Sequence, residues 1–66
     1  MNPTVVRNEL VEARRKLDDV YENIKKAMAY ADAEMYEELE EIRKRLVILM
    51  IDIDAEIELI EVEDHD

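Results

Sequence analysis

The sequence has no Cys, no Gly, no Trp and no Phe, and its single Pro is Pro3. Without Cys the chain can form neither a disulfide nor a thiolate metal site. Without Gly it lacks the residue on which phosphate-binding loops and the tight turns of β-hairpins depend. The residues that remain abundant, such as Ala, Leu, Glu, Lys, Arg and Met, are strong helix formers. We therefore expect an all-α protein.

The chain is also short. Its 66 residues form one domain at most, and a single core of this size rarely contributes more than about 3–5 kcal/mol. A hydrophobic content of 48% argues against disorder, although 42% of the residues are charged. Small folds without disulfides or metals usually depend on a second chain. A partner chain is therefore expected.

Positive charge is scarce, with nine Lys and Arg residues against 19 Asp and Glu residues and a net charge of −10. Such a chain is repelled by nucleic acids and by anionic membranes, so its expected partners are basic protein surfaces. The longest apolar run, residues 46–51, is far shorter than the roughly 20 residues of a membrane span. The polar N-terminus has no apolar segment of the signal-peptide type. We expect a cytoplasmic protein that binds neither nucleic acid nor membrane directly.

The first half of the sequence predicts a helix over residues 3–30. Asn2 is a favoured N-cap residue, and Pro3 is favoured at the first helical position because its missing N–H has no partner there. Apolar residues then alternate at spacings of four and three, which is the pattern of a coiled-coil seam. The residues of this first seam are Val6, Leu10, Ala13, Leu17, Val20, Ile24, Ala27 and Ala31.

A second seam follows with a different phase. Continuing the first seam from Ala31 puts the next core position at Glu38, whereas the apolar residue is Leu39. The shift indicates either a tight turn, with Asp32 as N-cap of a second helix, or a stutter within one helix of about 60 residues. The residues of the second seam are Met35, Leu39, Ile42, Leu46, Leu49, Ile53, Ile57 and Ile60.

Two observations favour the turn. The halves are nearly equal in length, and folding them together sets apolar residues opposite one another, such as Leu10 and Ile53. The same register brings opposite charges close, pairing Lys25 and Lys26 with Glu38 and Glu37, and Asp18 and Asp19 with Arg45 and Lys44. We predict one domain, residues 1–66, built as an antiparallel, coiled-coil-like hairpin of two helices. It comprises a helix over 3–30, a turn at about 31–33, a helix over 33–62 and an acidic tail over 63–66.

Residues 46–62 fit two structures. From residue 51 to 59 apolar and acidic residues alternate, which is typical of a strand, and such a strand would pair in trans with another copy or with a partner's sheet edge. As a helix, the segment has two apolar stripes, of which the first helix can cover only one. The second stripe therefore predicts self-association, as a homodimer that forms a four-helix bundle. Its residues are Ile48, Ile51, Ala55, Leu59 and Val62.

No residue set suited to catalysis is present. Thr4 is the only hydroxyl residue besides Tyr, and the only His is His65, near the C-terminus. The acids at 52, 54, 56, 58 and 63 have the spacing of an EF-hand loop, but Ile57 occupies the position that requires Gly. We predict a protein that is not an enzyme and that has no catalytic residues, no cofactor and no metal site.

The expected function is a non-enzymatic helical oligomerisation or adaptor module that acts through protein–protein binding, with itself as the first partner. The alternative is a small acidic inhibitor of phage or mobile-element type, which mimics nucleic-acid charge and blocks a basic nucleic-acid-handling protein. Both functions use the same predicted acidic surface. Its residues are Asp52, Asp54, Glu56, Glu58, Glu61 and Glu63, with Glu37, Glu40 and Glu41 as a second cluster.

Overall fold

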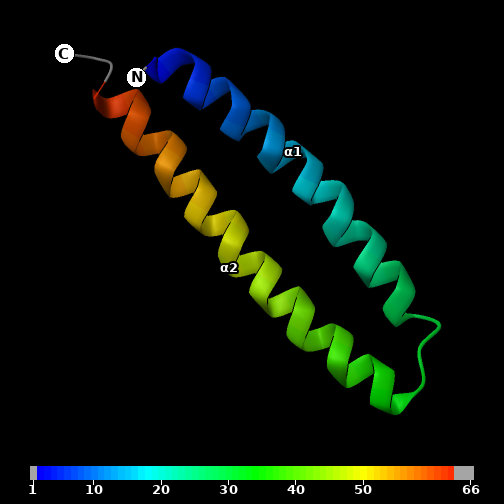
Figure 1. Cartoon of the computed structure of the whole chain (residues 1–66). Coiled ribbons are helices and arrows are strands. Elements are labelled where there is room, and N and C mark those ends of the chain that lie inside the picture. The colour runs from blue at the N-terminus through cyan, green and yellow to red at the C-terminus, as the bar shows by residue number, and fades with distance from the viewer. Residues whose placement is uncertain (1, 64–66) are drawn as a thin grey trace.

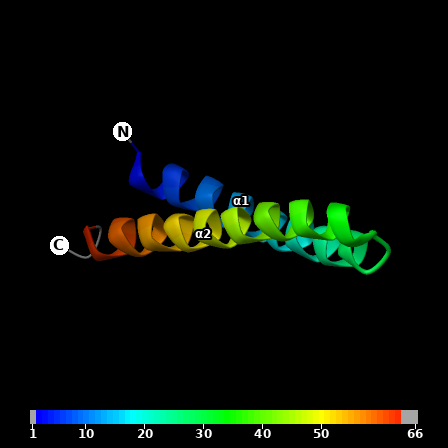
Figure 2. The ribbon, with the colours of Figure 1, turned by 90° about the horizontal axis from the view of Figure 1, so that it is seen from below.

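The computed structural model describes residues 2–63 and has two α-helices, α1 (Pro3–Met28) and α2 (Ala33–Glu63). They lie side by side and antiparallel, as Figure 1 shows, with Asn2 and Glu63 at the end opposite the turn. The molecule is a rod of 51 × 15 × 15 Å, and the view from below in Figure 2 shows its narrow profile. The predicted all-α hairpin is confirmed.

Both helices begin at the predicted caps. The Asn2 side chain accepts a hydrogen bond from the Val5 N–H at 3.3 Å. Asp32 Oδ1 accepts one from the Met35 N–H at 2.8 Å. Each cap satisfies a backbone donor that the first turn of a helix cannot pair internally.

The turn comes slightly earlier than predicted, at residues 29–32, because α1 ends at Met28 and not at residue 30. The N–H groups of Tyr30 and Ala31 bond to the carbonyls three residues before them, at 3.1 and 3.3 Å. This tighter bonding closes the last turn of the helix. No described residue has a positive φ, so the turn forms without glycine.

Residues 46–62 belong to α2. Two alternatives are therefore wrong for this chain: a strand in this segment, and a single helix of about 60 residues. In a helix every interior backbone N–H pairs within the segment, whereas a lone strand leaves its N–H and C=O groups without partners. The backbone thus favours the helix even though the side chains alternate between apolar and acidic.

The core between the helices is small. Among the described residues only Met28, Leu46 and Met50 are buried. Around them lie half-buried residues of the two predicted seams, Leu10, Leu17, Ile24, Leu39, Ile53, Ile57 and Ile60 among them. A core of three buried side chains is slight even for a domain of this length.

Five residues of the predicted seams are exposed: Val20, Ala27, Met35, Ile42 and Leu49. Met28 is buried in place of Ala27, and Met50 in place of Leu49. Likewise Arg43 is half-buried whereas Ile42 is exposed. The predicted seams assumed 3.5 residues per turn, whereas a straight helix has 3.6, so its inward face drifts by about 20° per heptad.

The charged pairs that were predicted across the hairpin do not form between the described residues. Lys25 pairs with Glu22 at 3.9 Å, and Lys44 with Glu41 at 3.6 Å, each within its own helix. Side chains three positions apart on one helix are neighbours without any crossing of the interface. The ion pairs that do join the two helices are Arg7–Glu61 at 2.8 Å and Arg14–Asp54 at 3.0 Å.

Candidate protein-interaction surfaces

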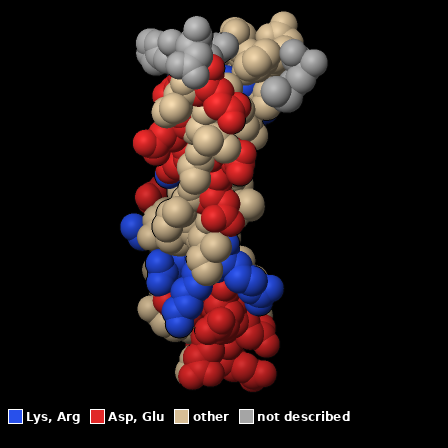
Figure 3. Space-filling view, turned by 90° about the vertical axis from the view of Figure 1, so that its left-hand side faces the viewer, with Lys and Arg blue, Asp and Glu red and all other residues tan. Residues whose placement is uncertain are grey.

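The predicted self-association residues lie on the outer face of α2, away from α1. We call this set, Ile48, Ile51, Ala55, Leu59 and Val62, the outer stripe. All five are exposed, and the four large side chains retain between 52 and 62% of their accessible surface. Figure 3, seen from the side of α2, shows uncharged surface running between acidic groups along this half of the molecule. Surface aliphatic residues are common singly, but a contiguous row of them marks an interaction site.

Acidic side chains border the outer stripe, and no Lys or Arg occurs after residue 45. Two of the predicted acids, Asp54 and Glu61, are paired with arginines of α1. The other four form no ion pair with any residue between 2 and 63. These four are Asp52, Glu56, Glu58 and Glu63, and all are exposed. The last turn of α2 also has no basic residue.

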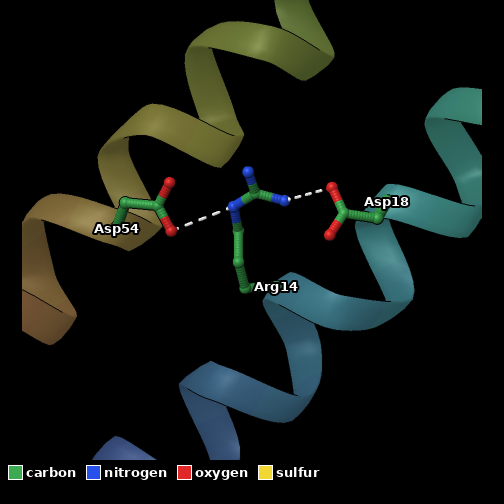
Figure 4. A network of polar contacts seen from close by, with 3 residues as sticks. All are labelled: Arg14, Asp18 and Asp54. Atoms are coloured by element: carbon green, nitrogen blue, oxygen red, sulfur yellow. Dashed lines mark hydrogen bonds and ion pairs between the residues drawn. The ribbon is translucent and has the colours of Figure 1, made fainter.

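Arg14 holds the two helices together on one flank of the hairpin (Figure 4). Its Nε donates to Asp54 of α2 at 3.0 Å, and its Nη1 donates to Asp18 of α1 at 2.6 Å. These hydrogen bonds, that to Asp18 foremost, raise the pKa of Arg14. We call the side that carries Arg14–Asp54 and Arg7–Glu61 the polar flank.

The second predicted acidic cluster is partly neutralised by neighbouring bases. Glu40 pairs with Arg43, and Glu41 pairs with Lys44. The hydrogen bond from Arg43 holds the pKa of Glu40 below its usual value, and the same bond is the main cause that raises the pKa of Arg43. In Figure 3 basic side chains form a band across the molecule that separates the acids near the turn from those of the other half.

An open hollow of about 550 Å³ lies on the polar flank near the turn. Tyr21, Lys25, Tyr36, Glu40 and Arg43 form much of its wall. The Lys25 ammonium lies 5.4 Å from the centre of the Tyr21 ring, in the geometry of a cation–π contact. Since Arg43 and Glu40 pair with each other, the charged groups of this hollow are largely engaged.

Sequence reasoning missed a second apolar surface on the flank opposite the polar one. It consists of every seventh residue on each helix, Ala13, Val20 and Ala27 of α1 and Met35, Ile42 and Leu49 of α2, and we call it the side patch. Successive residues of a helix are about 100° apart around its axis. These rows therefore lie along one edge of the contact between α1 and α2, and Arg7 and Arg14 lie along the opposite edge. The four large side chains retain 42–48% of their accessible surface. All six were predicted as seam residues facing the other helix, and five of them, all except the half-buried Ala13, are exposed. This exposure is the signal that reveals the patch.

Other kinds of site receive no support from the described residues. Between residues 2 and 63 no three or more His, Asp or Glu side chains gather in a way that could hold a metal ion. Over the same range neither helix has a stretch long and apolar enough to cross a membrane. Most of the predicted acidic tail, with His65, lies outside the described residues. A comparison with protein-family models, with curated proteins and with solved structures gives no match.

Proposed function

We propose that the protein is a non-enzymatic helical oligomerisation or adaptor module, which acts through protein–protein binding at the outer stripe of α2. The observation that carries this proposal is the exposure of the stripe, because four large aliphatic side chains in one row keep more than half of their surface in contact with solvent. Fully burying an exposed side chain of this kind contributes about 1.5–3 kcal/mol, and the four still have more than half of that surface to bury. Association at this surface therefore has a clear driving force.

The small core supports the same proposal. Three buried side chains leave the isolated hairpin little hydrophobic stabilisation. Two hairpins that bury their outer stripes against each other form a four-helix arrangement with a larger core. A homodimer is thus the simplest assembly in which the chain gains stability and covers the stripe at once.

The acids beside the stripe give self-association a characteristic salt dependence. Two copies that meet through the stripe bring Asp52, Glu56 and Glu58 of one near the same acids of the other. Like charges repel, and added salt screens charges that are exposed to solvent. Self-association through the stripe should therefore strengthen as salt concentration rises, whereas binding of a basic partner should weaken.

The test is sedimentation equilibrium of the full chain, wild type against Ile51→Asp. Wild type should sediment as a dimer or larger at low micromolar concentration, and the variant should have a dissociation constant at least tenfold higher. A matched control is Val11→Asp, since Val11 is also exposed but lies on α1, away from the stripe. A wild-type monomer that stays folded at these concentrations would exclude oligomerisation, and unchanged association of Ile51→Asp would exclude the stripe.

The acidic-inhibitor alternative has less support. The basic band at residues 43–45 divides the acids of α2 into two groups, and α1 arginines pair with Asp54 and Glu61. A nucleic-acid mimic needs an extended run of uncompensated charge. If that function applied, a basic nucleic-acid-binding protein would bind at low salt, and added nucleic acid would displace it.

A further inference from the structure

We infer that the side patch is a docking surface for a second copy of this chain, with α2 of one hairpin antiparallel to α2 of the other. The side patch and the outer stripe are different surfaces of the hairpin. The inference therefore goes beyond the proposed function, and one can fail without the other.

The side patch is continuous with the core between α1 and α2. Within each helix its residues come three or four positions from core residues, as Ile42 does from Leu46. On the other edge of that core, the Arg14–Asp54 and Arg7–Glu61 pairs already close the polar flank. A helix in a bundle contacts two neighbours through adjacent strips of its surface. In this hairpin each helix packs one strip against the other helix. The second strip, which belongs to the side patch, contacts no other helix of the described structure.

A two-fold axis beside Ile42 makes the patch complementary to itself. Ile42 then meets Ile42 of the second copy, and Met35 meets Leu49. Val20 of α1 lies near this level, because the residues next to Val20 and Ile42, Tyr21 and Arg43, line the same hollow. The same axis therefore sets Val20 against Val20 of the second copy. A single patch that pairs with its own copy is what a closed dimer requires.

Charge complementarity supports this occupant and this direction. Glu38 and Arg45 border the patch on the same side of α2, four residues before and three residues after Ile42. Neither forms an ion pair with another residue between 2 and 63. In the antiparallel dimer Glu38 of each copy lies opposite Arg45 of the other, so the axis generates two attractive pairs. The outer stripe, by contrast, has only acids as charged neighbours from residue 52 onward.

The sequence also limits the length of the patch. The row that contains Met35, Ile42 and Leu49 continues every seventh residue to Glu56 and Glu63, which are exposed acids. The apolar part of the row therefore spans residues 35–49, about 21 Å of helix. This places the docked copy against the half of the hairpin that contains the turn. The outer stripe, residues 48–62, stays largely outside the contact, and both surfaces can be occupied at once.

Charge reversal tests the docking without disturbing the core, since Glu38 and Arg45 are both exposed. Glu38→Arg replaces two attractive pairs with two repulsive ones, and in sedimentation equilibrium at low salt it should raise the dissociation constant about tenfold. The double variant Glu38→Arg/Arg45→Glu restores the pairs and should restore the affinity to within about threefold. Asp19→Arg is the matched control, because it makes the same charge change at an exposed position of α1 that belongs to neither surface.

Two apolar variants separate the inference from the proposed function. If both surfaces bind copies, wild type exceeds a dimer, Ile42→Asp and Ile51→Asp each reduce it to a dimer, and the combined variant is a monomer. Circular dichroism confirms that each variant remains helical. If Ile42→Asp unfolds, the charge variants decide the question alone.

The outcomes are distinguishable. A monomeric Ile51→Asp variant would overturn the docking at the side patch and leave the proposed function intact. Normal association of Ile51→Asp combined with weak association of Glu38→Arg would do the reverse. If Glu38→Arg associates as wild type does, the antiparallel contact of the two α2 helices is wrong.

Discussion

Arg14 and Asp54, 40 residues apart in the chain, are joined by a 3.0 Å hydrogen bond from Nε to Oδ1 across the two helices. Arg14 is only 25% exposed, so its aliphatic stem also lies against the hairpin while its guanidinium reaches α2. The bond defines which edges of α1 and α2 face each other. The edges that carry Arg14 and Asp54 form the polar flank, and the opposite edges of the two helices form the side patch.

Arg14→Gln should lower the melting temperature of the hairpin by a few degrees. The substitution removes a charge that bonds to both helices, but exposed ion pairs contribute little because water screens them. Thermal unfolding followed by circular dichroism measures the effect. Arg15→Gln is the control, since Arg15 pairs with Glu12 of the same helix. If Arg15→Gln lowers the melting temperature as much, the bridge between the helices has no special role.

Met50→Ala should unfold the hairpin at low protein concentration. Met50 is one of three buried side chains, and truncating a buried Met to Ala costs about 2–5 kcal/mol, which is comparable with the whole stability expected for so small a core. Urea unfolding gives the free energy. Met50→Leu keeps the volume and should lose less than about 1.5 kcal/mol. A cooperative transition of Met50→Ala at the wild-type midpoint would contradict the assigned core.

Asp32→Ala should destabilise the hairpin by about 0.5–2 kcal/mol, because the first turn of α2 loses the acceptor for the Met35 N–H. Asp32→Asn keeps an acceptor oxygen at the same position and should retain nearly all of the stability. Urea unfolding of the three proteins, compared at one concentration, measures the difference. Equal loss in the Asn and Ala variants would show that the negative charge of Asp32, and not its cap, matters.

The pH dependence of Glu40 should report its bond to Arg43. Hydrogen bonding to Arg43 lowers the pKa of Glu40, so the pair stabilises the hairpin above the ordinary pKa of Glu. That contribution is lost as pH falls through the lowered pKa of the folded state. Carboxyl chemical shifts in NMR give the pKa, and Arg43→Gln should raise the pKa of Glu40 toward the ordinary value of a Glu side chain. Arg15→Gln, which acts on Glu12, should leave the Glu40 titration unchanged.

Local signals predicted the elements of the fold well. Asn2 and Asp32 cap the two helices as predicted. The phase shift between Ala31 and Leu39 marked the place of the turn, although by itself it fitted a stutter in one long helix equally well. The end of α1 was less predictable, since no Gly or Pro marks it and its last bonds simply tighten at Tyr30 and Ala31. The sequence left open whether residues 46–62 form a helix or a strand. The alternation of side chains says nothing about how the backbone N–H and C=O groups find hydrogen-bond partners.

The side on which the helices meet could not be read from the seams. Apolar residues at spacings of four and three occur both in a helix that packs against one neighbour and in a helix that packs against two. The spacing alone therefore does not tell which side of the row faces the other helix. The sequence does contain one difference: the residue after Ala27 and the residue after Leu49 are both Met, and the structure shows that both are buried. The positions on the opposite border, such as Glu38 and Arg45, are charged. The helices are therefore expected to meet on the side of the seams that carries the two Met residues, which is the side next to the polar flank.

The acids of α2 have a consequence for how the hairpin opens. The C-terminal end of a helix carries partial negative charge, and an acid placed there without a basic partner, such as Glu63, raises the free energy of the helical state. The final turns of α2 should therefore unwind first, and their amide hydrogens should exchange fastest with solvent. Leu59 and Val62 of the outer stripe lie in these turns. Whatever binds the stripe would thus complete the folding of the helix that it recognises, and slower amide exchange at this end would record the event.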